Sequence, residues 1–306
     1  MSKLTAYLGL LLAMLLWGTS FVALKIALLN YPPFTVVFGR MFVATFIFFL
    51  IWPKIKPKKI YFSDLKLILL MALFEPCLYF IFEGYALKYT SASQASLIVA
   101  TLPLMVGIGA NLLLKEPLNL KIILGFILAI LGVYVLTIFS HPESTSPNPY
   151  LGNFLEFLAM AMATGYTLLV RLLSRNYHPF FLSAAQAIIG SLFFLPLALY
   201  FDPWKSFSFH LSGFLAILYL GSVVSFLAYS LYNQGVGAIS ASKAAAFVNL
   251  IPVFTLFFSW LLLKETLNLP QIGGAILVGI GIALSQEVFQ KGSRKSHSLK
   301  AKKTKL

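Results

Sequence analysis

Charged side chains are scarce in this sequence. Only 10% of its 306 residues are Asp, Glu, Lys or Arg, whereas soluble proteins carry about 25%. The hydrophobic fraction is 59% and the mean hydropathy is +0.89. A water-soluble core has no room for that much apolar surface, so a lipid bilayer is the expected solvent.

Cysteine is nearly absent, and so are the motifs of cofactor-binding enzymes. Cys77 is the single cysteine, which excludes an internal disulfide and a cysteine metal cluster. The sequence has no His-Glu-x-x-His zinc signature and no phosphate-binding glycine loop ending in Lys-Ser or Lys-Thr. We therefore expect no enzyme, no cofactor and no metal site.

Acidic residues are also few, with 9 against 23 Lys and Arg and a net charge of +14. Nucleic-acid binding is one explanation of such a charge, but the distribution argues against it. The segments Lys54–Lys66 and Lys291–Lys305 hold 5 and 7 of the 23 basic residues, each beside an apolar run. Basic residues mark the cytoplasmic loops of membrane proteins. We therefore predict cytoplasmic N- and C-termini and no nucleic-acid partner.

Apolar runs are what the sequence has in abundance. Helical spans across a bilayer need about 20 residues, and ten segments are long enough. They are Leu4–Leu29, Phe34–Trp52, Leu65–Leu87, Ser91–Leu114, Lys121–Phe139, Tyr150–Leu173, Phe180–Phe201, Phe209–Gln234, Ser240–Leu263 and Pro270–Val288. The segments lack the alternation of a membrane β-barrel. We predict an all-α integral membrane protein with ten transmembrane helices.

The stretch from Ser91 to Leu136 recurs 149 positions later. A Ser-Ala-Ser triplet, a proline, a Leu-Leu-Leu-Lys-Glu run, Leu-Asn-Leu and two glycines return in the same order, beginning at Ser240. The chain is therefore a duplication. Because each copy has five spans, an odd number, the second copy must enter the membrane upside down, which gives two inverted five-helix repeats.

The boundaries follow from this repeat. We expect a first repeat at residues 1–140 and a second at 150–290. Residues 141–149, rich in Pro and Ser, form the predicted periplasmic linker. Residues 291–306 form a basic cytoplasmic tail.

Several motifs resemble one superfamily. They are Trp17-Gly18-Thr19-Ser20-Phe21, Arg40, the two Ser-Ala-Ser triplets and the two Lys-Glu-x-Leu turns. Together they resemble the drug/metabolite transporter (DMT) superfamily, specifically its ten-span EamA-type exporters with two EamA domains. The resemblance implies a secondary transporter of the bacterial inner membrane. Such proteins export amino acids, other metabolites or drugs by alternating access, often with the proton gradient. The second half departs from this pattern, with Gln186 where the first has Arg40.

Placing an ionisable side chain near the bilayer centre costs at least about 2.5–3.5 kcal/mol, so we expect each such residue inside a span to have a structural or functional role. Six are found: Lys25, Arg40, Glu75, Glu83, Glu156 and Lys243. Glu75 precedes Pro76 in the middle of a span, and is either a proton or substrate site or a neutral, hydrogen-bonded carboxyl. Tyr79 and Glu83 are expected on the same helix face as Glu75.

Four of these groups, Lys25, Arg40, Glu83 and Glu156, fall at a similar predicted depth towards the outer face. Two interpretations stay open, namely an outer gate or zwitterion site, and a structural cluster of ion pairs. Arg40 is the strongest substrate candidate, because a guanidinium binds carboxylates in a bidentate manner.

Pro103 and Pro252 interrupt spans four and nine at matching points. Broken spans in corresponding positions indicate a transporter's binding site, and a static kink is the alternative. Asn249 and Trp17 are further candidates for the cavity wall. The repeated glycines of spans five and ten predict close helix packing.

We therefore expect a transporter that exports amino acids or similar small metabolites, with protons as the candidate coupling ion. Cationic drug efflux, a lipid flippase and a non-transporting membrane scaffold are the alternatives. The expected partners are a small-molecule substrate and membrane lipid. Two fused inverted halves make a monomer sufficient, and a dimer stays open.

Overall fold

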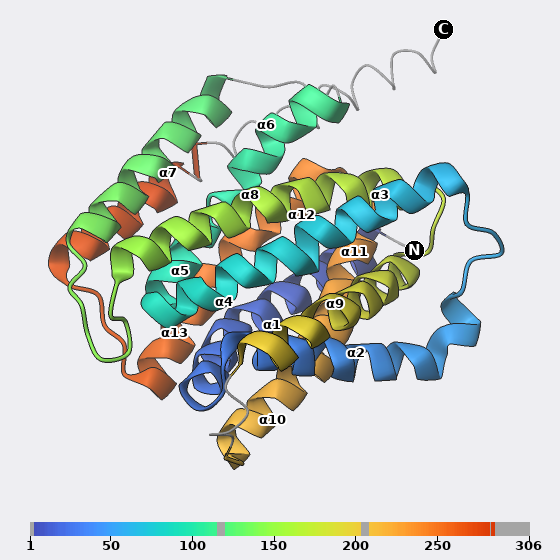
Figure 1. Cartoon of the computed structure of the whole chain (residues 1–306). Coiled ribbons are helices and arrows are strands. Elements are labelled where there is room, and N and C mark those ends of the chain that lie inside the picture. The colour runs from blue at the N-terminus through green and yellow to red at the C-terminus, as the bar shows by residue number, and fades with distance from the viewer. Residues whose placement is uncertain (1–2, 115–119, 203–207, 282, 285–306) are drawn as a thin grey trace, which may run out of the picture.

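The fold is given by a computed structural model of the chain, shown in Figure 1. The structure describes residues 3–114, 120–202, 208–281 and 283–284. The predicted cytoplasmic tail and the first of the two Lys-Glu turns, at Lys115 and Glu116, lie outside the described residues.

The described residues are almost entirely helical, with one isolated β-bridge between Glu143 and Ser146. Eight helical segments in this part of the chain are long and apolar enough to cross a membrane, and two shorter apolar helices accompany them. With the two repeats, this is a ten-helix layout of two inverted five-helix units, as predicted. The continuous helices are α1 (Lys3–Asn30), α2 (Pro33–Ile55), α7 (Leu120–Ile138), α8 (Pro149–Leu173), α9 (Pro179–Phe201) and the last helix (Leu269–Gly281).

Four spans are interrupted, and they form two repeat-related pairs. Span three comprises α3 (Phe62–Ala72), the wide helical turn η1 (Leu73–Leu78) and α4 (Tyr79–Tyr89), and span eight comprises α10 (Leu211–Tyr219), the wide turn η3 (Leu220–Ala228) and α11 (Tyr229–Ala238). Span four comprises α5 (Ala92–Val99) and α6 (Leu102–Leu114). Span nine comprises α12 (Ala241–Ala246), η4 (Phe247–Leu250), α13 (Ile251–Phe258) and η5 (Ser259–Leu263). The breaks in spans four and nine confirm the prediction from Pro103 and Pro252, whereas those in spans three and eight were not predicted as a pair.

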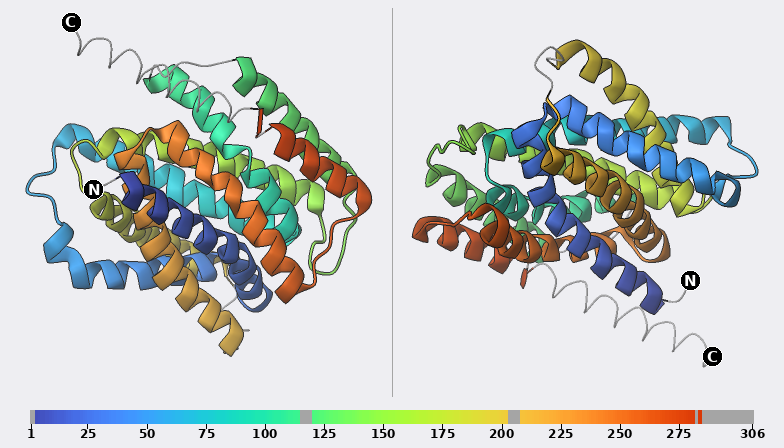
Figure 2. Two further views of the ribbon diagram at one scale, coloured as in Figure 1. Left: turned by 180° about the vertical axis from the view of Figure 1, so that it is seen from behind. Right: turned by 90° about the horizontal axis from the view of Figure 1, so that it is seen from below.

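Spans four and nine pack against each other in opposite directions. The first segment of span four, α5, contacts α13, and its second segment, α6, contacts α12. Each span therefore begins beside the end of the other, as an inverted repeat requires. Figure 2 shows the same two spans from behind, adjacent along their length.

Glu265 fixes one end of this pairing. Span nine ends at Lys264, whose left-handed backbone (φ 59°) is a helix-terminating conformation. The Glu265 carboxylate then accepts hydrogen bonds from the Ala92 N–H at 3.1 Å and from the Ser93 N–H at 2.9 Å. A carboxylate at a helix N-terminus satisfies free backbone donors and complements the helix dipole. The second half thus caps a helix of the first.

Helix α7 and the last helix cross at glycines, whose lack of a side chain lets the two backbones approach closely. A Cβ atom added to Gly274 would lie 2.8 Å from the Gly132 carbonyl oxygen and 3.0 Å from the Leu136 nitrogen. One added to Gly132 would lie 2.6 Å from the Gly274 carbonyl oxygen. The predicted glycine packing of spans five and ten is therefore confirmed.

Two predicted span ends were wrong. Pro53 was expected to end the second span, but α2 continues to Ile55, because the proline removes only one donor and the Lys56 N–H still bonds to the Trp52 carbonyl at 3.0 Å. The eighth span was expected to end at Gln234 and instead continues to Ala238.

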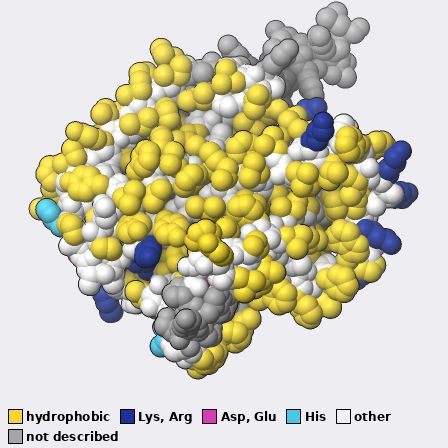
Figure 3. Space-filling model, viewed as in Figure 1, with side chains coloured by type: hydrophobic (Ala, Val, Ile, Leu, Met, Phe, Trp, Pro, Cys, Tyr) yellow, Lys and Arg dark blue, Asp and Glu magenta, His cyan; other side chains and the backbone are white. Residues whose placement is uncertain are grey.

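The surface is apolar around the middle and basic at one end. In Figure 3 hydrophobic side chains cover the visible face, and Lys and Arg gather at the right-hand end, where Figure 1 places the loop between α2 and α3. This distribution fits a multi-pass membrane protein whose helices run between a basic end and a less basic one.

Candidate functional site

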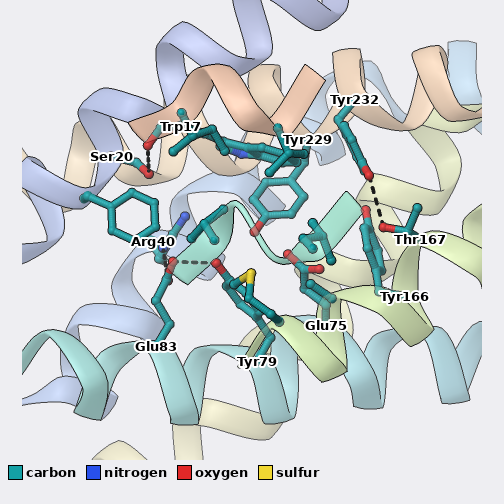
Figure 4. A pocket seen from close by; sticks show the side chains of 17 residues that line it. Trp17, Ser20, Arg40, Glu75, Tyr79, Glu83, Tyr166, Thr167, Tyr229 and Tyr232 are labelled. Carbon is teal, nitrogen blue, oxygen red and sulfur yellow. Dashed lines mark hydrogen bonds and ion pairs between the residues drawn. The ribbon is translucent and has the colours of Figure 1, made fainter. Parts of the chain in front are cut away.

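A cavity lies between the two halves, with walls from both. Figure 4 shows it from close by: Arg40, Glu75, Tyr79 and Glu83 come from the first half, and Tyr166, Tyr229 and Tyr232 from the second. Of the predicted site residues, Trp17, Arg40, Glu75, Tyr79 and Glu83 line this cavity. Lys25, Pro103, Asn249 and Pro252 do not.

The broken spans contribute to the cavity through the residues next to their prolines. Val99 and Leu102 line it from span four, and their repeat mates, Val248 and Ile251, line it from span nine, 149 positions on in each case. The prolines themselves lie just inside α6 and α13. The breaks therefore border the cavity, and the prolines lie outside its wall.

Glu75 lies at the break of span three. Its backbone (φ −148°, ψ 115°) is extended, in the middle of a helical span. The following Pro76 explains this, because a residue before proline is pushed out of the helical region. Glu75 is only 4% exposed, and in Figure 4 the Tyr229 hydroxyl points towards its carboxyl. The predicted midplane carboxyl therefore faces the cavity with a partner from the other half (Figure 4).

Aromatic rings form the wall beside Glu75. The Trp17 ring centroid lies 5.0 Å from that of Tyr229 and 4.7 Å from that of Tyr232. Tyr166 meets Tyr229 edge to face at 6.3 Å, and its hydroxyl donates a 2.6 Å hydrogen bond to Asn233. A carboxylate among aromatic faces suits an ammonium group, which the rings attract through their quadrupoles.

Arg40 is the positive group of the cavity, and its side chain is 2% exposed. Its Nε donates to the Ser225 hydroxyl at 3.0 Å, and its guanidinium carbon lies 4.2 Å from the centroid of the Phe80 ring. Its Nη1 lies 3.8 Å from Glu83 Oε2, which is ion-pair distance but longer than a hydrogen bond. The Tyr79 hydroxyl donates to Glu83 Oε1 at 2.6 Å.

Lys25 does not line the cavity and instead binds backbone carbonyls. Its Nζ donates to three backbone carbonyls, those of Leu87 at 2.5 Å, Thr90 at 2.5 Å and Thr145 at 2.6 Å. These tie α1 to the end of α4 and to the linker between the halves. A lysine at the C-terminus of a helix satisfies free carbonyls. The predicted cluster of four mutually paired charges is therefore reduced to one ion pair, Arg40 with Glu83, among the described residues.

The cavity is small in this conformation. It offers about 40 Å³ to the centres of water molecules, and one ordered water needs roughly 10–15 Å³ by that measure. The space holds a few waters but no organic solute. Within the described residues, no three His, Cys, Asp or Glu side chains come together in a way that could hold a metal ion.

The sequence did not single out three residues of the site. Two of them line the cavity, Thr167 and Met160, and the third accepts a hydrogen bond from Arg40, Ser225. Ser225 had one usable signal, since it follows Pro76 by 149 positions and belongs to the repeat-related break of span eight. Thr167 and Met160 carry no signal, because small polar and apolar residues occur throughout these spans.

Comparisons with known proteins agree with this architecture. The profile of the EamA-like transporter family matches residues 4–138 and 150–286. The chain is 27% identical to the uncharacterized transporter YetK of Bacillus subtilis over 90% of this chain and 86% of that protein. It is 28% identical to a probable amino-acid metabolite efflux pump of Salmonella typhimurium over 93% of this chain and 95% of that protein. A solved crystal structure superposes with a TM-score of 0.68 at 17% identity, covering 95% of this chain and 99% of that one.

Proposed function

The chain belongs to the EamA-like transporter family, and from this premise we propose that it exports amino acids or similar zwitterionic metabolites by alternating access. In this proposal the proton gradient drives export, and the cavity between the halves binds the solute.

The observation that carries the proposal is the presence of opposite charges in one buried cavity, where Arg40 is ion-paired with Glu83 and Glu75 is a second acid. Arg40 supplies a cation and Glu75 an anion, and both side chains are at least 95% buried. Ionisable groups at membrane depth are rare because burial is costly, so two of opposite sign in one cavity favour a ligand that carries both charges. The carboxylate of an amino acid would bind Arg40, and its ammonium group would bind Glu75 among the aromatic rings.

Alternating access would use the interrupted spans. Four spans break beside the cavity, in repeat-related pairs. Inverted repeats allow the same rearrangement to open one face and then the other around a fixed site. The small volume of the cavity suits a closed intermediate between those two states.

We assign the basic end of the molecule to the cytoplasm of a bacterium and the linker at 141–149 to the periplasm. Lys and Arg gather at the end with the α2–α3 loop, and cytoplasmic loops carry that excess. The N- and C-termini would then be cytoplasmic and the membrane would be the inner one. The expected partners are the solute, protons and lipid, with a monomer as the transporting unit.

A thermal-shift experiment with three matched ligands tests the two-charge site. The full chain in detergent is heated with L-phenylalanine, with phenethylamine, which lacks the carboxylate, and with 3-phenylpropionate, which lacks the amine. A ligand that binds only the folded state raises the melting temperature. The proposal expects the largest shift for the zwitterion. Equal shifts for all three, or none for any amino acid in a wider panel, would reject it.

Efflux of organic cations is the second candidate, and the aromatic wall around Glu75 favours it. Phenethylamine would then stabilise the protein at least as well as L-phenylalanine. A lipid flippase or a scaffold would respond to none of the three ligands.

A further inference from the structure

Glu156 is a carboxyl group that the cavity does not use. It lies on α8, its side chain is 0% exposed, and it is not part of the cavity wall. Neither of its oxygen atoms has a hydrogen-bond partner among the described residues. This differs from Glu83, which accepts a hydrogen bond from the Tyr79 hydroxyl.

An ionised carboxylate in this position would have nothing to stabilise it. Removing such a charge from water costs several kcal/mol even after relaxation, and the group instead keeps its proton. The neutral acid carries no such cost. Glu156 is therefore a buried group that holds one exchangeable proton in the closed conformation.

Glu83 lies on α4, the helix packed most extensively against α8. Glu83 interacts electrostatically with Glu156, and Tyr79 interacts electrostatically with both carboxyl groups. Glu83 keeps its own charge, since Tyr79 donates to it at 2.6 Å and Arg40 lies at 3.8 Å. Glu156, which has no such partner among the described residues, therefore holds the proton.

The other acidic and basic residues on elements packed against α8 are Asp64 and Lys66 of α3, Glu75 of η1, Lys88 of α4, Lys121 of α7 and Lys243 of α12. Glu75 faces Tyr229 of α11 across the cavity. Asp64, at the start of α3, accepts from Tyr177 in the loop after α8. Lys88 lies in the last turn of α4 and Lys243 in α12.

We propose that Glu156 is the proton-binding site of the transport cycle and is separate from the solute-binding residues Arg40 and Glu75. When Glu156 releases its proton to the cytoplasm, one negative charge appears beside the cavity and favours the ammonium group of a solute. When a proton returns from the periplasm, that charge is removed and the solute is released. One proton is thus exchanged for one solute, with no other bond made or broken.

This inference rests on the proposed proton-driven export, and its test compares Glu156→Gln with Glu83→Gln. Glutamine resembles a protonated glutamate, so E156Q keeps the melting temperature of the wild type at neutral pH. E83Q lowers it, because Arg40 loses its counter-charge in the protein interior. E143Q, at an exposed acid of the linker, is the matched control and changes nothing.

Transport is then measured in proteoliposomes with a radiolabelled mixture of L-amino acids. Wild-type affinity should change up to tenfold per pH unit across the titration, as exchange of one proton demands, and a pH gradient should drive accumulation. E156Q should still exchange solute between compartments of equal pH, with a pH-independent affinity and no gradient-driven accumulation.

Two results would overturn the assignment of Glu156, and they are distinguishable from failure of the proposed function. If the wild type is driven by the gradient and E156Q is driven equally, Glu156 is not the proton site, while proton-driven export stands. If wild-type vesicles exchange amino acids without any pH dependence, proton coupling itself fails, and the assignment fails with it.

Discussion

Tyr31 and Tyr177 make the same contact at opposite ends of the molecule. The Tyr31 hydroxyl accepts from the His210 N–H at 2.9 Å, where span eight begins. The Tyr177 hydroxyl accepts from the Tyr61 N–H at 3.2 Å, where span three begins. His210 follows Tyr61 by 149 positions, so the two contacts are repeat-related. Each half therefore contacts the start of a broken span of the other half.

Removing one hydroxyl should favour opening at that face. Each hydroxyl makes at least two hydrogen bonds, Tyr31 with the N–H and carbonyl of His210, and Tyr177 with the Tyr61 N–H and the Asp64 carboxylate. At about 1 kcal/mol for each bond, Y31F and Y177F should each shift the balance of states about 30-fold, in opposite directions. The readout is a single cysteine at the cavity position Val99, in a protein with Cys77 replaced by alanine. Membrane-impermeant thiol reagents should label it faster from the periplasm in Y31F and from the cytoplasm in Y177F. The same change of rate in both variants would contradict the paired role.

Breaking the Arg40–Glu83 pair should destabilise the fold. R40A leaves the Glu83 carboxylate buried without its cation, which typically costs about 3–5 kcal/mol. The double variant R40M/E83M removes both charges at similar volume and should recover most of the melting temperature. It should not recover amino-acid binding. A double variant that melts as low as R40A would show that the loss comes from packing.

Neutralising Glu75 should affect binding more than stability. Glutamine has nearly the size and shape of glutamate, so E75Q is expected to fold normally. It loses a charge-assisted contact to the ammonium group, worth about 1.5–3 kcal/mol, which predicts roughly a 10- to 100-fold weaker affinity for L-phenylalanine. Calorimetric titration measures this, with E143Q as the control. An affinity within twofold of the wild type would place the ammonium elsewhere.

Adjacent glycines of the last helix offer a matched test of helix packing. A Cβ at Gly274 would meet the Gly132 carbonyl at 2.8 Å, whereas one at Gly273 would meet nothing within 4 Å. G274A should therefore lower the melting temperature, and G273A should leave it unchanged or raise it, because alanine favours helix by about 1 kcal/mol. Equal effects of the two substitutions would mean that these helices do not cross at Gly274.

Much of this architecture could be predicted from the sequence, because the bilayer imposes long apolar spans and the repeat at Ser91 and Ser240 fixes their relation. Glu75 could be singled out for the same reason, since a carboxyl before a proline is conspicuous in such a span. The partners of Lys25 could not, because its three acceptors are backbone carbonyls, which every residue has. Glu156 shows the same limit, since depth along a helix does not reveal which neighbour a side chain meets.

The central claim is that the cavity between the halves binds the exported solute. The most direct measurement is efflux from proteoliposomes preloaded with the radiolabelled L-amino acid mixture, comparing wild type, E75Q and R40K. The account predicts saturable efflux by the wild type and efflux near that of protein-free liposomes for both variants. Wild-type efflux no faster than that of protein-free liposomes, or equal efflux by all three proteins, would contradict it.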